Sequence, residues 1–94
     1  MAHSRDHQAK LLAIVTLEAE HQYLGSDEYQ ASRPWSRLDD LAQQAWSMKT
    51  CKALGISPER WRSAVSTWRH PGQSVKLLLG EMRELYPDNI DPAN

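Results

Sequence analysis

Residues 48–69, MKTCKALGISPERWRSAVSTWR, predict two helices joined by one sharp corner. The corner needs a residue that tolerates a positive φ, and Gly55 provides one at the end of the first helix. The second helix needs an early cap. Ser57 offers a side-chain oxygen for this purpose, and Pro58 has the φ of a first helical residue. We therefore expect one helix to end at Gly55 and another to begin directly after Ser57.

The residues around this corner also favour close packing of the two helices. Cys51 is a small residue four positions before Gly55, where the helices approach each other. Four apolar side chains are expected to fill the angle between the helices: Leu54, Ile56, Trp61 and Ala64. In the second helix, one face is expected to be buried because its apolar residues repeat at helical spacing: Trp61, Ala64, Val65 and Trp68.

This stretch resembles the helix-turn-helix of bacterial and phage DNA-binding domains, with Ala-Leu-Gly-Ile-Ser at its centre. The resemblance covers about residues 47–69 of the 94-residue chain. It implies a small DNA-binding protein, such as a transcriptional regulator, in which the helix beginning at Pro58 is a recognition helix in the major groove. Two positions depart from the family pattern. Thr50 stands where an apolar residue is usual, and Trp61 replaces Val, Ile or Leu.

The predicted DNA-binding residues lie on the polar side of the second helix and near the corner. Arg62 is long enough to reach a guanine edge, and Ser63 or Ser66 is expected to contact a phosphate. Two lysines at the end of the first helix would clamp phosphates as well. Glu59 is unfavourable beside phosphate, although glutamate accepts a hydrogen bond from cytosine. The candidate DNA-binding residues are Lys49, Lys52, Ser57, Glu59, Arg60, Arg62, Ser63, Ser66 and Arg69.

Charge is distributed unevenly along the chain, although the formal net charge is only −1. Residues 46–73 carry five basic side chains and one acidic side chain, a local charge of +4. Residues 1–45 sum to −3 and residues 74–94 to −2. A basic segment attracts nucleic acid, but the same charges are equally compatible with an ordinary solvated face.

The whole chain predicts a small all-α domain. No stretch alternates with the period of a strand, and 94 residues suffice for one domain with a small core. The segment 87–94 is expected to be frayed. Four helices are expected, at about residues 4–24, 35–54, 58–69 and 73–86.

Several details of these helices are also predicted. Ser36 and Asp39 resemble a capping box for the second helix, which is either continuous or broken near Ser47. Gly80 in the last helix is expected to let another backbone approach. Thr16 is expected outside the buried stripe of the first helix. The buried stripe of the first helix is expected to contain Leu11, Ile14, Val15 and Ala19, with Leu12 beside it. The apolar repeat of the second helix consists of Leu38, Leu41, Ala42, Ala45 and Met48.

The chain has four tryptophans and no phenylalanine. Burial in the core is the favoured use of Trp35, Trp46, Trp61 and Trp68, since few other large side chains are present. Trp is also enriched at binding hot spots. This leaves a second function open: a non-enzymatic protein-binding module that acts through a Trp-rich helical surface, as in phage or mobile-element inhibitors and adaptors.

No residue pattern indicates catalysis or a cofactor. Cys51 has no partner in a CxxC motif, and there is no glycine-rich phosphate loop. His3, Asp6 and His7 have a spacing that metal ligands use, but histidines near a chain end are usually solvated. We expect neither an enzyme nor a metal site.

The chain has the features of a cytoplasmic protein. A single cysteine excludes an internal disulfide, and the first residues lack the basic-then-apolar pattern of a signal peptide. The longest apolar run, residues 11–15, is too short for a membrane span. If the protein binds DNA, a homodimer is expected because dimers contact two half-sites. The Leu-rich last helix is preferred over the first helix as the dimer contact.

Overall fold

The computed structural model describes residues 2–87, with side chains from Arg5 onward, and confirms the all-α fold. The described residues form four α-helices and one 3-10 turn: α1 (Ala2–Leu24), η1 (Trp35–Arg37), α2 (Asp40–Leu54), α3 (Pro58–Trp68) and α4 (Val75–Leu85). None of these helices is both long enough and apolar enough to cross a bilayer. Apart from Pro87, the segment predicted to fray lies outside the described residues.

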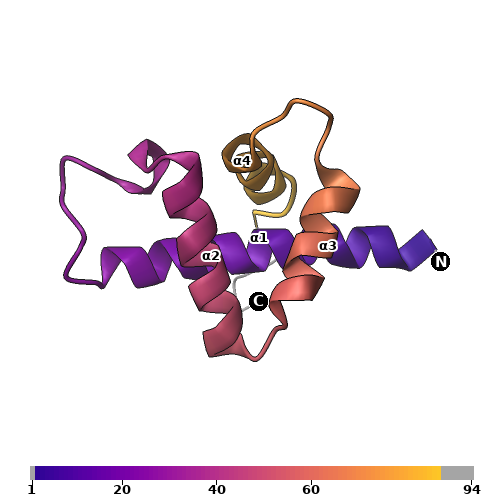
Figure 1. Ribbon diagram of the computed structural model, residues 1–94, viewed down its shortest axis with the longest axis horizontal. Helices are drawn as coiled ribbons and strands as arrows, with labels where there is room; N and C mark the ends of the chain where they lie inside the picture. The colour runs from indigo at the N-terminus through magenta and orange to yellow at the C-terminus, as the bar shows by residue number, and fades with distance from the viewer. Residues whose placement is uncertain (1, 88–94) are drawn as a thin grey trace.

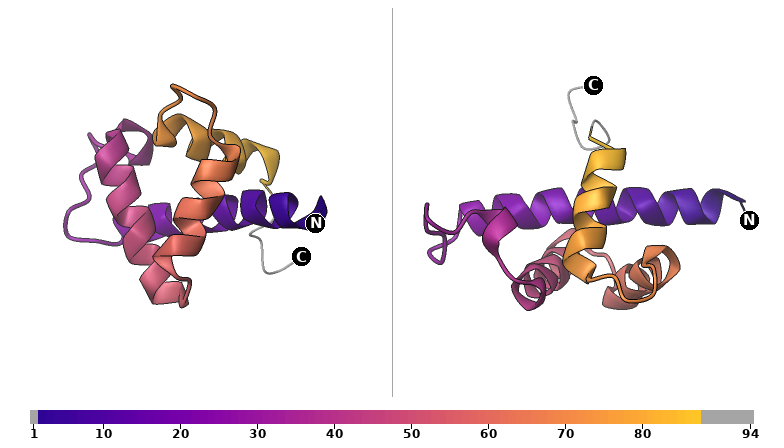
Figure 2. Two further views of the ribbon diagram at one scale, coloured as in Figure 1. Left: turned by 45° about the vertical axis from the view of Figure 1, so that its right-hand side comes forward. Right: turned by 90° about the horizontal axis from the view of Figure 1, so that it is seen from above.

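The longest helix, α1, contacts each of the other three helices. Figure 1 shows α1 crossing behind α2 and α3, which stand side by side as the two arms of a V that meets at a corner. Seen from above in Figure 2, α2 and α3 lie on one side of α1, and α4 crosses α1 steeply. The arrangement leaves the front of α2 and α3 uncovered by other helices.

The core consists of two groups of buried side chains along α1. The larger group joins α1 to α3, α4 and the end of α2: Ala9, Leu12, Ala13, Val15, Cys51, Trp61, Ala64, Val65, Val75, Leu78, Leu79 and Met82. The smaller group joins α1 to η1 and the start of α2: Ala19, Tyr23, Trp35, Leu38 and Trp46. Trp35, Trp46 and Trp61 are each less than a tenth exposed, which confirms the predicted core role for these three tryptophans. Trp68 is only half-buried.

The corner between α2 and α3 has the predicted caps. Gly55 has a φ of 74°, and its N–H donates to carbonyl oxygens in the last turn of α2. The Ser57 hydroxyl accepts from the Arg60 N–H over 3.2 Å, and Pro58 is the first residue of α3. Cys51 is fully buried, as expected for the small residue before the corner.

The start of α2 differs from the predicted capping box of Ser36 and Asp39. Leu38 is extended, with φ −65° and ψ 144°, which ends the helical geometry of η1 before α2 begins. Asp39 alone caps α2, because its side chain accepts from the Ala42 N–H over 2.8 Å. From there α2 continues without a break to Leu54.

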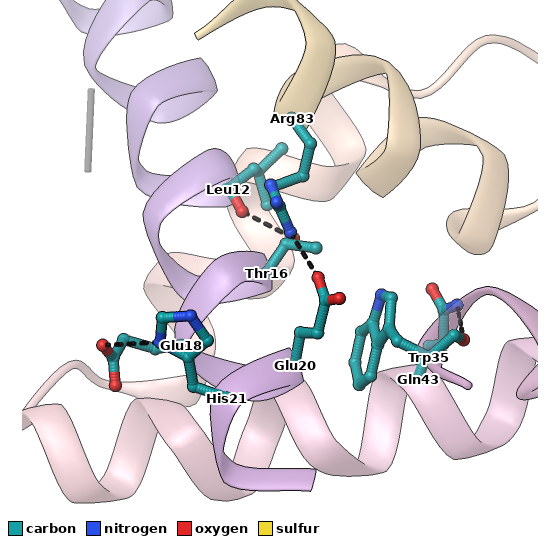
Figure 3. Close-up of polar contacts among 8 residues, drawn as sticks. All are labelled: Leu12, Thr16, Glu18, Glu20, His21, Trp35, Gln43 and Arg83. Carbon is teal, nitrogen blue, oxygen red and sulfur yellow. Dashed lines mark hydrogen bonds and ion pairs between the residues drawn. The ribbon is translucent and has the colours of Figure 1, made fainter. Parts of the chain in front are cut away.

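The buried faces of α1 and α2 also differ from the predicted stripes. Leu41 is 76% exposed and Leu54 is 43% exposed, so neither fills a gap between helices. Three polar side chains of α2 are buried instead, and each donates to a backbone carbonyl oxygen: Gln43, Ser47 and Thr50. In α1, Thr16 is buried in the same way by donating to the Leu12 carbonyl oxygen (Figure 3). Because their hydrogen bonds are made, these polar groups are buried at little cost.

The helix α4 uses most of its apolar surface inside the domain. Leu78 and Leu79 are buried, whereas Leu77 is 63% exposed and Leu85 is 58% exposed. A Cβ added at Gly80 would meet no atom within 4 Å, so the predicted close approach of another backbone is wrong. Because Leu78 and Leu79 are buried in the core, α4 leaves little of the Leu-rich surface that was expected to form a dimer contact.

Candidate functional site

All nine candidate DNA-binding residues from Lys49 to Arg69 have exposed side chains. They occupy the end of α2, the corner and α3. One side of α3 is unavailable because Trp61, Ala64 and Val65 are buried against the rest of the domain. The remaining surface of α3 is a strip with one edge facing α2 and the other facing α1.

The edge of α3 that faces α2 carries Arg62, Ser66 and Arg69. Spacings of four and three residues place these side chains along one ridge of the helix. They line a groove of about 570 Å³ between the two helices. We call this the α2–α3 groove; its lining residues are Gln44, Met48, Trp61, Arg62, Val65, Ser66, Arg69, His70 and Pro71.

The edge of α3 that faces α1 carries Arg60 and Ser63. These two residues line a smaller groove of about 350 Å³ together with His7, Gln8 and Leu11 of α1. At 100° per residue, Glu59 falls between the two edges, in the first turn of α3. The candidate residues of α3 thus form two basic edges rather than one row.

The two lysines of α2 are separate from both grooves. The Lys49 ammonium lies 4.6 Å from the centroid of the Trp46 ring, a cation–π contact on another side of α2 from Met48. Lys52 is exposed in the last turn of α2 and lines neither groove. The structure therefore does not bring these lysines together with Arg62 and Arg69. The Ser57 hydroxyl is occupied by its role as the cap of α3.

Six residues of the α2–α3 groove were not among the sequence candidates for a site: Gln44, Met48, Trp61, Val65, His70 and Pro71. Trp61 and Val65 were expected only as core residues. Gln44 and Met48 are four residues apart, so they share one face of a helix, but the sequence does not reveal that this face meets α3. His70 and Pro71 follow Arg69 directly, and the loop that they begin after α3 lies at the groove. Their position directly after the basic helix is the feature of the sequence that points to them.

The basic side chains of the domain fall into two classes. Some have partners within the domain. The guanidinium carbon of Arg5 lies 4.3 Å from the centroid of the Trp68 ring, and Arg83 forms a 2.8 Å ion pair with Glu20 (Figure 3). Others make no ion pair or side-chain hydrogen bond with residues 5–87, and four of these six surround α3: Arg33, Arg37, Lys52, Arg60, Arg62 and Arg69. The second class leaves positive charge around α3 available to an external anion.

Two observations concern metal-binding and nucleophilic groups among the described residues. Among them, no three His, Cys, Asp or Glu side chains gather closely enough to hold a metal ion. Burial raises the pKa of the Cys51 thiol, which keeps it protonated and poorly nucleophilic. Within residues 5–87, one buried donor has no partner: the indole N–H of Trp61. The chain matches no protein-family model, no curated protein and no solved structure.

Proposed function

We propose that α2, the Gly55 corner and α3 form a helix-turn-helix that binds DNA, with α3 in the major groove. The observation that carries this proposal is the pair of basic edges on α3, with Arg60 on one and Arg62 and Arg69 on the other. A recognition helix lies between two phosphate backbones. Basic residues on both of its edges therefore have phosphates within reach.

The middle of the exposed surface of α3, formed by Glu59 and by the inner residue of each edge, Ser63 and Ser66, suits contact with bases. Ser63 and Ser66 are short, so the backbone of α3 can approach the base edges, and their hydroxyls both donate and accept hydrogen bonds. Glu59 lies in the first turn, the part of a recognition helix that enters the groove first, and a carboxylate accepts from the cytosine amino group. Lys52 supports the interface from the end of α2.

A single short recognition helix gives modest affinity, so we propose that two copies bind two half-sites of the DNA. The exposed Leu77 and Leu85 are the apolar residues that α4 still offers to a second copy. Their small combined surface fits a dimer that forms mainly on DNA.

The test compares two charge-matched variants in DNA-binding measurements. Fluorescence anisotropy is recorded with pooled genomic fragments at 50 and 200 mM salt. We expect the wild type to bind at low salt, and Arg60→Gln with Arg62→Gln to weaken binding about tenfold or more. The control, Arg33→Gln with Arg37→Gln, removes the same charge from exposed residues outside α3 and is expected to leave binding within about twofold, since neither arginine belongs to the interface. Equal losses in the two variants, or no binding by the wild type at low salt, would refute the proposal.

A second candidate function is binding to a protein through exposed leucines. The Trp-rich surface suggested by the sequence is not available, because Trp35, Trp46 and Trp61 are buried. Leu41 and Leu77, however, are 76% and 63% exposed, and they follow Asp40 and Lys76, whose hydrogen bond joins α2 to α4. Binding at this apolar surface would vary little with salt. A wild type that binds no DNA but retains a partner at high salt would favour this function.

A further inference from the structure

The α2–α3 groove has the size and lining of a small-molecule site. Its volume of about 570 Å³ lies within the range of about 300–1,000 Å³ that ligand sites occupy. Met48, Trp61 and Val65 supply apolar side chains beside the polar Gln44 and Ser66. Figure 1 shows the two helices that flank the groove, α2 and α3, and the loop after α3 that contributes His70 and Pro71.

The charge of the groove is one-sided. Arg62 and Arg69 line it, His70 adds an imidazole, and no carboxylate is among its lining residues. Both arginines are exposed and make no ion pair with a carboxylate of residues 5–87. Guanidinium groups bind carboxylates through paired hydrogen bonds. The groove therefore selects for a negative charge.

One residue that lines this groove also has a buried donor without an acceptor among the described residues. The Trp61 side chain lines it and is only 3% exposed, and the Trp61 indole N–H donates to no acceptor among the described residues. Leaving a buried N–H unpaired costs about 1–3 kcal/mol, so most such groups have partners in folded proteins. An acceptor atom on a bound molecule would supply the missing partner.

We propose that the α2–α3 groove binds a small aromatic carboxylate. Arg62 and Arg69 hold the carboxylate, and the ring lies against Met48, Val65 and Trp61. Inorganic phosphate would satisfy the arginines but leave the apolar side chains uncovered, and a cation would be repelled. This site does not depend on the proposed DNA binding, because it is a property of the protein alone and is tested without DNA.

The test uses 1-naphthoate as the probe and 1-naphthylmethanol as its neutral counterpart. Each compound is titrated into the full-length ¹⁵N-labelled protein while the indole N–H resonances of the tryptophans are followed by NMR. We expect 1-naphthoate to shift the Trp61 resonance saturably and to leave that of Trp35, in the other core group, unchanged. The neutral compound should bind roughly 5–10-fold more weakly. No saturable shift at Trp61, or equal binding of both compounds, would overturn the proposal.

Two charge-matched variants then locate the site. Arg62→Gln with Arg69→Gln removes both arginines of the groove, and we expect it to weaken 1-naphthoate binding roughly 5–10-fold. Arg37→Gln with Arg60→Gln removes the same charge from residues outside the groove and should bind as the wild type does. All four arginines are exposed, so circular dichroism should show the same helical content in both variants. Equal weakening in the two variants would mean that net charge alone attracts the probe, and the site would be rejected.

Discussion

The backbone N–H of Lys76 donates to the Asp40 carboxylate over 2.7 Å, so a residue at the start of α2 caps the start of α4. The N–H of Lys76 lies in the first turn of α4, where no helical carbonyl is available to it. The Lys76 ammonium also donates to the Leu38 carbonyl oxygen over 2.6 Å. These two contacts join the start of α2 to the start of α4. The neighbouring Leu38 belongs to the smaller core group, and the neighbouring Val75 belongs to the larger one.

We expect Asp40→Ala to lower the free energy of unfolding by about 1–2 kcal/mol, because it removes one of the two side-chain acceptors at the start of α4, the other being the N-cap Ser74. Asp40→Asn should cost less, since the amide oxygen still accepts from the Lys76 N–H. Urea denaturation followed by circular dichroism measures both values. The control is Asp27→Ala in the exposed loop after α1, which should change stability by less than about 0.5 kcal/mol. Similar losses for Asp40→Ala and Asp27→Ala would contradict the capping role.

Trp61 should respond very differently to two substitutions. Trp61→Ala is expected to cost about 3–5 kcal/mol of unfolding free energy, because the side chain is 3% exposed and lies in the larger core group. Trp61→Phe should cost less than about 1.5 kcal/mol, since Phe retains a ring and removes an N–H that has no acceptor.

Trp68→Phe is the comparison for this prediction, because the Trp68 indole N–H donates to the Arg5 carbonyl oxygen over 2.8 Å. That substitution removes a hydrogen bond that is actually made. Urea denaturation of the three variants compares their losses of unfolding free energy. If Trp61→Phe were as costly as Trp61→Ala, the Trp61 N–H would have to make a stabilising contact.

The parts of the fold that were predicted correctly depend on local chemistry. Gly55 ends α2 and Ser57 caps α3, and each of these roles involves only residues within a few positions. Such interactions are nearly independent of where the rest of the chain lies. They can therefore be read from the residues alone.

The incorrectly predicted features depend on where neighbouring helices lie. The apolar repeat placed Leu41 in the core, yet the buried side of α2 carries Ser47 and Thr50, whose hydroxyls bond to carbonyl oxygens of their own helix. A count of apolar residues cannot recognise such a face. In the same way, the sequence identified the exposed arginines of α3 but not that Arg60 faces α1 while Arg62 faces α2.

Glu59→Gln tests the proposed orientation of α3 on DNA. In that orientation the Glu59 carboxylate enters the negative potential between the two phosphate backbones, and in random DNA most sites offer it no cytosine, so its neutralisation should strengthen binding to random-sequence duplex by about 2–5-fold at low salt. Fluorescence anisotropy at 50 mM salt measures the change. The control is Glu28→Gln, a substitution of an exposed residue in the loop after α1. Its change in the logarithm of the dissociation constant should be less than half that of Glu59→Gln. Weaker binding of random DNA by Glu59→Gln would contradict the orientation.

The contact between Asp6 and Tyr86 joins the first turns of α1 to the end of α4. The Tyr86 hydroxyl donates to Asp6 Oδ1 over 2.6 Å, and the Lys10 ammonium lies 3.2 Å from Asp6 Oδ2. The hydrogen bond from Tyr86, followed by that from Lys10, lowers the pKa of Asp6 below its ordinary value of 3.8. The same hydrogen bond raises the pKa of Tyr86 above its ordinary value of 10.0.

The sign of each shift defines the pH range of this contact. The folded pKa of Asp6 is lowered, so its contribution is present above the unfolded value and is lost as the pH falls through the folded value. The folded pKa of Tyr86 is raised, so its contribution is present below the unfolded value and is lost as the pH rises through the folded value. The contact is therefore fully formed between roughly pH 4 and pH 10.

We expect Tyr86→Phe to raise the pKa of Asp6 toward 3.8, because the largest cause of the lowering is removed while Lys10 remains. An NMR titration of the Asp6 carboxyl carbon between pH 2 and pH 7 measures this change. Tyr29→Phe is the matched control, since Tyr29 lies against Tyr23 at the other end of α1 and should leave the pKa of Asp6 unaltered. An Asp6 titration that is identical in wild type and Tyr86→Phe would mean that the hydrogen bond is not maintained in solution. The end of α4 would then be held to α1 by the Arg83–Glu20 ion pair and by apolar contacts, among them that of Met82.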